Sequence, residues 1–145
     1  MSNTESKKPP ADLQSCLIEH EGLELKPYQD SKGNTTIGIG RNLDTFGITQ
    51  DEAFYMLKTN IAKSELELSK YDWFASIDKV RRDALVELNF NMGHKTFLGF
   101  KRMIKAIKLK QWSVAAYELV DSQWAIDVGD ARSMNLFKRL RDGKY

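Results

Sequence analysis

The stretch from Glu19 to Arg41 constrains this chain more than any other, because it joins a helix end, a tight turn and a glycine-rich strand. Gly22 follows a helical pattern and can take the left-handed conformation that commonly ends a helix. Pro27 disfavours any continuation of that helix. The segment Asp30 to Gly33 is typical of a turn, and residues 34–40 favour β-structure. The stretch therefore predicts a helix followed by a β-hairpin.

Glu21 is an unusual residue for the last turn of a helix, where the helix dipole disfavours a negative charge. Glu19 and Glu24 add like charges beside it. Repulsion between these carboxylates favours the protonated form of Glu21, which is the form that a general acid needs. A residue that is unfavourable for local stability, such as a negative charge at the end of a helix, is expected at a functional site. Taken alone, a glutamate at a helix end is usually an ordinary solvated charge, so the hypothesis depends on its neighbours.

Two more polar residues join this hypothesis if the hairpin has a particular loop. A loop of three residues, Ser31 to Gly33, would place Asp30 opposite Asn34. Thr36 lies two residues further along, so the three polar side chains would share one face of the ribbon. A loop of four residues would turn Thr36 to the opposite face. A site that combines Glu21, Asp30 and Thr36 therefore requires the three-residue loop.

Length and composition are those of a globular protein. The 145 residues, 41% of them apolar and 29% charged, suffice for one domain with a sizeable core. No apolar run approaches the ~20 residues of a membrane span, and the polar start lacks the apolar core of a secretory signal. Residues 1–10 are predicted to be a disordered tail. The single cysteine, Cys16, excludes an intrachain disulfide, fits a reducing cytoplasm and is expected to be buried on the first helix.

Positive charge is concentrated near the C-terminus. From Lys101 to Tyr145 there are ten Lys and Arg residues against five Asp and Glu. Such an excess suits a polyanionic surface, such as a bacterial envelope or nucleic acid. A solvated helix face explains it equally well. Charge alone therefore does not identify a partner.

Most of the remaining chain is predicted to be helical, from apolar residues spaced by three and four positions. Asp12 is expected to cap the first helix, a Thr49–Glu52 capping box the second, and Ser76 the third, which Gly93 ends. A loop is expected from Asn42 to Gly47 and a break from Asp72 to Ser76. The predicted helices comprise residues 11–21, 49–69, 77–92, 100–109, 112–120 and 130–140.

These elements predict an α+β protein that is mainly α. Residues 11–145 form one domain in this interpretation, with a small helix-and-hairpin lobe over about residues 11–48. A long connecting helix follows over residues 49–70, and a helical lobe over residues 71–145. A cleft between two lobes is a natural place for a substrate.

The site residues stand in EHEGLELKPYQD and TTIGIG, and this stretch resembles the catalytic segment of the phage-type lysozymes, the endolysin muramidases of glycoside hydrolase family 24. The resemblance continues through RRDALVELNFNMG, a W-x-x-A-A motif at Trp112 and an S-x-W motif at Ser122. It extends from about Leu13 to the C-terminus. The ordered spacing of three site residues together with several further motifs makes it specific. It implies a lysozyme-like fold.

The resemblance implies hydrolysis, with inversion, of the β-1,4 bond between N-acetylmuramic acid and N-acetylglucosamine in peptidoglycan. Glu21 matches the general acid, Asp30 the second carboxylate, and Thr36 the threonine that positions the attacking water. A protonated acid and an ionised carboxylate are what glycoside hydrolysis requires. No cofactor or metal is needed.

Further positions match the family's substrate contacts. Phe90, Asn91 and Arg132 match substrate-binding residues, with Arg132 expected to face the general acid. Asn91 suits an acetamido group, although a helix-end cap explains it equally well. Arg41 replaces a histidine that often follows the glycine-rich strand, so a stabilising pair of the family must be rebuilt. Asn42, Met103 and Glu118 replace other sugar-contact residues, which leaves subsite preference open.

The family also implies a biological setting. An endolysin degrades the wall of its host for phage release, and is bacteriolytic and antimicrobial. The protein is expected to be a monomer that waits in the host cytoplasm until a holin releases it to the wall, without a stable complex, nucleic acid or membrane insertion.

Other functions remain as alternatives. A lytic transglycosylase would act on the same glycan strands without a water-positioning carboxylate, and a non-catalytic wall-binding module would need neither acid. His20 and Glu21 superficially match a zinc motif, but the second histidine is missing. The three tryptophans, Trp73, Trp112 and Trp124, could stack on sugars. Their spacing nevertheless favours core packing for at least two of them.

Overall fold

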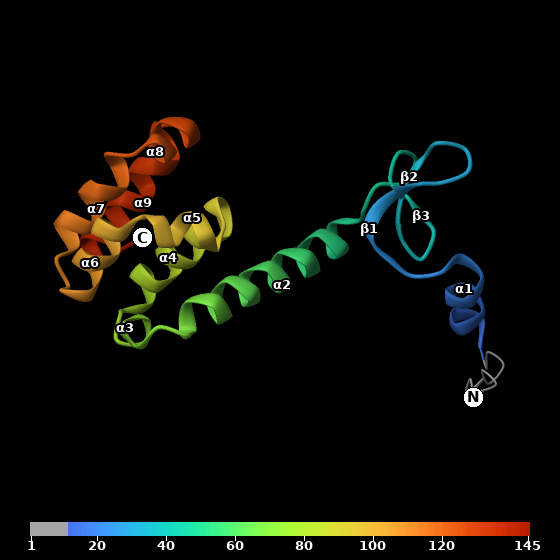
Figure 1. Cartoon of the computed structure of the whole chain (residues 1–145), viewed down its shortest axis with the longest axis horizontal. Coiled ribbons are helices and arrows are strands. Elements are labelled where there is room, and N and C mark those ends of the chain that lie inside the picture. The colour runs from blue at the N-terminus through green and yellow to red at the C-terminus, as the bar shows by residue number, and fades with distance from the viewer. Residues whose placement is uncertain (1–11) are drawn as a thin grey trace, which may run out of the picture. The chain divides into compact units, whose positions relative to one another are not determined.

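The computed structural model describes residues 12–145, so the predicted tail and Ala11, the first residue of the predicted helix, lie outside the described residues. The fold is mainly helical with one small antiparallel sheet, as predicted. The chain divides into two compact units, one ending at Ala53 and one from Phe54 to Tyr145. Figure 1 labels their elements.

The first unit begins with helix α1, Leu13–Glu21. Its cap is Asp12, as predicted, whose Oδ1 accepts a hydrogen bond of 2.7 Å from the backbone N–H of Ser15. Gly22 ends the helix with φ 77°, and its N–H donates to the carbonyl of Ile18 at 2.9 Å. No residue of α1 is buried and Cys16 is only half-buried, so the expectation of a buried cysteine is wrong.

A sheet of three antiparallel strands follows, in the order β1, β2, β3. The strands are β1 Glu24–Gln29, β2 Thr35–Gly38 and β3 Arg41–Asn42. The hairpin was predicted to begin at about Tyr28 but begins at Glu24, because Pro27 is tolerated in the edge strand β1. The predicted loop from Asn42 is wrong at its start, since Asn42 pairs with Thr36 in the β2–β3 ladder.

Helix α2, Gln50–Ser69, confirms the predicted capping box. The backbone N–H of Thr49 donates to the Glu52 carboxylate at 2.8 Å, and the N–H of Glu52 donates to Thr49 Oγ1 at 3.2 Å. Two orphan donors of the first helical turn are therefore satisfied reciprocally. The boundary between the two units falls within α2.

The rest of the second unit is built from seven shorter helices (Figure 1). They are α3 Asp72–Ala75, α4 Lys79–Met92, α5 His94–Gly99, α6 Lys101–Lys108, α7 Trp112–Val120, α8 Gln123–Val128 and α9 Asp130–Asp142.

Two predictions near α4 are corrected. The expected break is α3, a single helical turn, and Ser76 does not cap the next helix because its hydroxyl donates to the carbonyl of Trp73 at 3.0 Å. Asp78 caps α4 instead, accepting from the backbone N–H of Arg81 at 3.2 Å. Gly93 ends α4 with φ 80°, as predicted.

The core of the second unit is one cluster of buried apolar side chains. All three tryptophans pack against it while partly buried, which confirms the predicted core role for at least two of them. The largest fully buried apolar side chains come from six helices: Leu68, Leu85, Leu88, Phe97, Met103, Ile107, Leu119, Leu136 and Leu140.

One polar side chain, Asn89, is buried at the edge of this core with 2% of its surface exposed. Its amide nitrogen donates to Ser64 Oγ and to a Glu67 carboxylate oxygen, both at 2.8 Å. Its Oδ1 lies 2.8 Å from Nδ1 of His94, whose Nε2 lies 3.1 Å from the hydroxyl of Tyr71. This network ties α2, α4 and α5 together.

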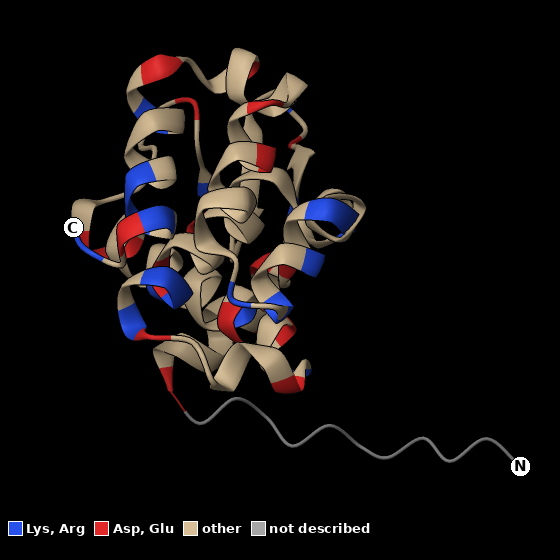
Figure 2. Cartoon of the chain, turned by 90° about the vertical axis from the view of Figure 1, so that its left-hand side faces the viewer, with Lys and Arg blue, Asp and Glu red and all other residues tan. Residues whose placement is uncertain are grey.

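Both signs of charge occur along the helices that Figure 2 brings to the front. The positive excess near the C-terminus is therefore not one uniform face. It is most concentrated in α6, whose sequence KRMIKAIK contains four basic residues and no acidic one. Among residues 12–145, no helix combines the length and apolar character that crossing a membrane requires.

Candidate active site

The Glu21 carboxylate lies against the backbone of Gly40. Gly40 has φ 71°, and a Cβ placed there would be only 2.9 Å from Oε2 of Glu21. Only glycine permits so close an approach without displacing the acid. The sequence signal for this contact was the glycine that ends the strand, since such glycines often mark close backbone approach. Gly40 therefore contacts a predicted site residue without being one itself.

The hairpin loop has the three residues that the hypothesis requires. The N–H of Asp30 donates to the carbonyl of Asn34 at 2.9 Å, and Gly33 is left-handed with φ 80°. The ladder continues with Gln29 opposite Thr35 and Tyr28 opposite Thr36. Because side chains alternate along a strand, this register puts Asp30 and Thr36 on the same face of the ribbon.

The Asp30 carboxylate is held by donors from its own turn. Oδ1 accepts from the backbone N–H groups of Lys32 and Asn34, both at 2.8 Å, and Oδ2 accepts from the Asn34 side-chain amide at 3.0 Å. The Asn34 amide is the largest cause that lowers the pKa of Asp30 from its ordinary value, followed by the Asn34 backbone N–H. Asp30 is therefore ionised at neutral pH, as its predicted role requires.

Thr36 is buried, with 3% of its surface exposed. Its hydroxyl donates to the carbonyl of Asn34 at 3.1 Å, so the hydroxyl oxygen still has capacity to accept. Asn34 thus contacts both predicted site residues of the hairpin. Asn34 was predicted to lie on their face without a role, although an asparagine after an Asp-x-x-Gly turn is a local signal for such bonding.

Arg41, which replaces a histidine of the family, was predicted to form a different stabilising pair, and it does so. Its guanidinium makes a bidentate pair with Glu52, at 3.1 Å and 2.8 Å, and also donates to the carbonyl of Gly47 at 3.2 Å. Bidentate geometry fixes the orientation of both partners. The pair connects β3 with the start of α2.

The three predicted substrate-binding residues belong to the second unit. Phe90 is 45% exposed at the end of α4. Asn91 does not cap that helix, since its Oδ1 accepts from the indole N–H of Trp124 at 2.8 Å. Arg132 lies 3.4 Å from Glu87, which also pairs with the buried Arg139 at 2.6 Å.

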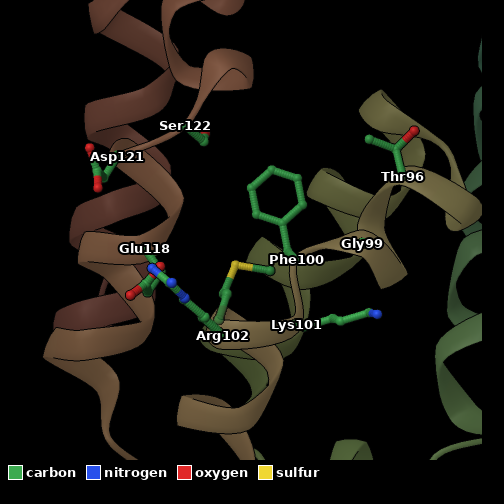
Figure 3. A pocket seen from close by; sticks show the side chains of 9 residues that line it. Thr96, Gly99, Phe100, Lys101, Arg102, Glu118, Asp121 and Ser122 are labelled. Carbon is green, nitrogen blue, oxygen red and sulfur yellow. The ribbon is translucent and has the colours of Figure 1, made fainter.

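A pocket of about 590 Å³ lies in the second unit, between the start of α6 and the end of α7 (Figure 3). It contains Met103 and Glu118, two positions at which the family resemblance places sugar contacts. Phe100 points into it, and Arg102 and Asp121 add charged groups to its lining. Over the described part of the chain, no three His, Cys, Asp or Glu residues are grouped to hold a metal ion.

Replacing Gly40 with alanine is expected to reduce activity about tenfold, because a displacement of catalytic groups by less than 1 Å already costs rate. The new Cβ would meet the end of the Glu21 side chain, which can move, so the acid shifts while the fold persists. Gly38→Ala is the matched control. Gly38 has a similar φ of 70° but no atom within 4 Å of a built Cβ. Equal activity losses in a wall-clearing assay would contradict the assigned contact.

Replacing Asp30 with asparagine is expected to lower the melting temperature at neutral pH. A carboxyl whose pKa is lowered on folding stabilises the protein above its ordinary pKa, and this contribution disappears as the pH falls through the lowered value. The melting temperatures of wild type and Asp30→Asn should therefore converge below the ordinary value of 3.8. Thermal unfolding between pH 7 and pH 2.5 measures this, with Asp51→Asn as a control in the same unit. A constant difference across that range would count against the prediction.

Comparison with known proteins identifies the family of this chain. The phage lysozyme family model matches residues 18–143. A Dictyostelium discoideum protein named as a probable T4-type lysozyme 2 is 30% identical over 79% of this chain and 85% of its own length. An endolysin of Salmonella phage P22 is 31% identical over 69% of this chain and 73% of its own length. The chain therefore belongs to the phage lysozyme family, and it is a glycosidase that hydrolyses peptidoglycan.

Proposed function

We propose that this enzyme hydrolyses the β-1,4 bond between N-acetylmuramic acid and N-acetylglucosamine, with inversion. The observation that supports this best is the hairpin itself, which holds one ionised carboxylate, Asp30, beside a buried hydroxyl, Thr36. An inverting glycosidase needs a base that activates water and an acid that protonates the leaving oxygen. Asp30 supplies the base and Glu21 the acid.

Asp30 has the capacity that a base requires. Its Oδ1 is occupied by two backbone donors, while Oδ2 accepts one bond from the Asn34 amide. One lone pair of Oδ2 is free to accept a proton from an attacking water. The hydroxyl oxygen of Thr36, on the same face, accepts a second hydrogen bond from that water and orients it toward the anomeric carbon.

Glu21 delivers its proton to the departing sugar oxygen. At the end of α1 its carboxylate lies against the backbone of Gly40. The side chain is otherwise exposed, so the carboxyl group is accessible to the leaving oxygen. Glu21 then carries the negative charge after transfer, and solvent restores the proton between turnovers.

The second unit contributes substrate contacts in this proposal. Phe90 offers an exposed aromatic ring, and Asn91 offers its amide nitrogen while its oxygen stays bound to Trp124. Arg132 binds substrate with part of its guanidinium, the other part facing Glu87. The pocket of Figure 3 accepts a further sugar or its substituent.

The biological role that we propose is host-cell lysis for phage release, supported by the likeness to the phage P22 endolysin. The monomeric enzyme waits in the cytoplasm until a holin opens the membrane. Expression in bacteria that contain no such membrane-permeabilising protein should leave the cells intact with the enzyme in the cytosolic fraction, and spontaneous lysis would contradict holin dependence.

Analysis of the released fragments tests the reaction. Purified peptidoglycan is incubated with the enzyme, and the products are separated and weighed by mass spectrometry. Hydrolysis predicts reducing ends, and proton NMR should show the α-anomer first if the bond is cleaved with inversion. Anhydro-sugar ends would instead establish a lytic transglycosylase, and no products at all would establish a wall-binding module.

A further inference from the structure

A row of lysines lies on α6 beside an aromatic pair, and of these residues only Lys101 also lines the pocket of Figure 3. Lys101, Lys105 and Lys108 are spaced by four and three residues, so they share one face of the helix. The row is roughly 10 Å long at 1.5 Å per residue. Together with Tyr71 and Trp73 these lysines line a groove of about 450 Å³, here named the lysine–aromatic groove.

The aromatic side of this groove is fixed in place. The rings of Tyr71 and Trp73 stack at a centroid distance of 5.6 Å with 23° between their planes. Trp73 packs against the core, and the Tyr71 hydroxyl is bonded to His94 at 3.1 Å. A surface that is already ordered loses little entropy on binding. The pair is therefore a preformed platform for the apolar face of a flat ligand such as a sugar ring.

The charged side of the groove has no internal partner. Within the described residues none of the three lysines takes part in an ion pair, and no carboxylate lines the groove. All three side chains are exposed. Three unpaired cations over a groove without acids are complementary to a ligand that carries several negative charges.

The remaining chemistry distinguishes between anionic partners. Of the apolar side chains of α6, Met103, Ala106 and Ile107 are buried in the protein core and Ile104 is half-buried in the groove. The exposed Leu98 and Leu109 precede and follow α6, so the helix itself presents no exposed apolar face to a lipid bilayer. A net charge of +2 is low for a protein that binds nucleic acid. A polymer that combines sugar rings with carboxylates matches both sides of the groove, and peptidoglycan, with its acidic stem peptides, is such a polymer.

We propose that the lysine–aromatic groove is a second contact with peptidoglycan, in which the lysines bind stem-peptide carboxylates and the aromatic pair carries a sugar ring. This contact keeps the enzyme on its polymeric substrate between cleavage events. The choice of polymer rests on the proposed function, but binding at the groove requires no hydrolysis.

Co-sedimentation with insoluble peptidoglycan tests the groove. All proteins carry Glu21→Gln so that the polymer stays intact, and the test variant adds Lys105→Ala and Lys108→Ala. Lys101 is retained because it also lines the pocket of Figure 3. The matched control removes Lys58 and Lys63, two exposed lysines of α2. Since one exposed ion pair changes an equilibrium constant by up to about fivefold, the test variant should bind about fivefold more weakly at low salt and the control within twofold.

Two further measurements identify the occupant. Peptidoglycan whose carboxyls have been converted to amides should bind the protein with intact groove lysines and the test variant equally. In about 1 M salt, the difference in affinity between these two proteins for untreated peptidoglycan should also vanish. Equal binding of the test variant and its control to untreated peptidoglycan would overturn the proposal. The proposal would also be overturned if the test variant lost binding only to single-stranded DNA or only to anionic phospholipid vesicles. Failure of the proposed reaction would be seen separately, in the fragment analysis.

Discussion

Replacing Glu21 with glutamine is expected to reduce the rate of wall clearing by about 10³-fold, within the range that general acid catalysis usually contributes. Glutamine keeps the size of the side chain and its place against Gly40, so the fold should persist. It cannot donate a carboxyl proton to the leaving oxygen. The rate of turbidity loss of purified cell walls measures the effect.

Glu19 and Glu24 provide matched controls for this substitution, because both are exposed carboxylates within three residues of Glu21. Glu19→Gln and Glu24→Gln remove the same charge from the same segment. We expect each to lose far less activity than Glu21→Gln, since it removes only one of the two like charges that favour the protonated form of Glu21 and leaves the proton donor in place. A comparable loss in all three variants would show that local charge, not proton donation, is what the assay detects.

Replacing Asn89 with alanine is expected to lower the free energy of unfolding by about 3 kcal/mol, because the buried Ser64 and the half-buried Glu67 and His94 each lose a hydrogen-bond partner. The Ser64 hydroxyl donates to the carbonyl of Val86, so its oxygen must accept from the Asn89 amide nitrogen. That fixes the amide orientation, and Oδ1 must accept from Nδ1–H of His94. Alanine removes the three bonds of the Asn89 side chain, to Ser64, Glu67 and His94. Urea unfolding followed by circular dichroism measures the change.

Asn60→Ala is the control for this prediction, since Asn60 is exposed on α2 and should change stability by less than about 0.5 kcal/mol. The fluorescence of the tryptophans near the core provides a second probe of the same transition. A cost below about 1 kcal/mol for Asn89→Ala would mean that water replaces the lost bonds and that the network is not a stability determinant.

The features that the sequence predicted well are those that depend on residues close together in the chain. The hairpin register follows from the turn residues Asp30 to Gly33, and the capping box from Thr49 and Glu52, which are three residues apart. Both depend on bonds within a few residues, and the structure confirms both. The family resemblance supplied the functional assignment, which local rules alone left open between a catalytic and a solvated Glu21.

What the sequence did not predict depends on partners far along the chain. Strand β3 has two residues, too few to show a periodic pattern, and exists because β2 pairs with it. Asn89 lies among apolar positions of α4, and its partner Ser64 is 25 residues away. The contact of Gly40 with Glu21 likewise joins two separate elements. The start of α4 was ambiguous locally, because Ser76 and Asp78 are both acceptable caps.

The bidentate pair of Arg41 with Glu52 has a consequence for how this family can diversify. Glu52 serves at once as the reciprocal cap of α2 and as the partner of Arg41. A mutation of Glu52 therefore loses two functions, and a mutation of Arg41 leaves a carboxylate that the helix still requires. Evolution can exchange the cation at position 41 for another only while that carboxylate is retained. Position 41 should therefore vary more readily than position 52, and the loop between them must keep the Gly47 carbonyl within reach of the cation.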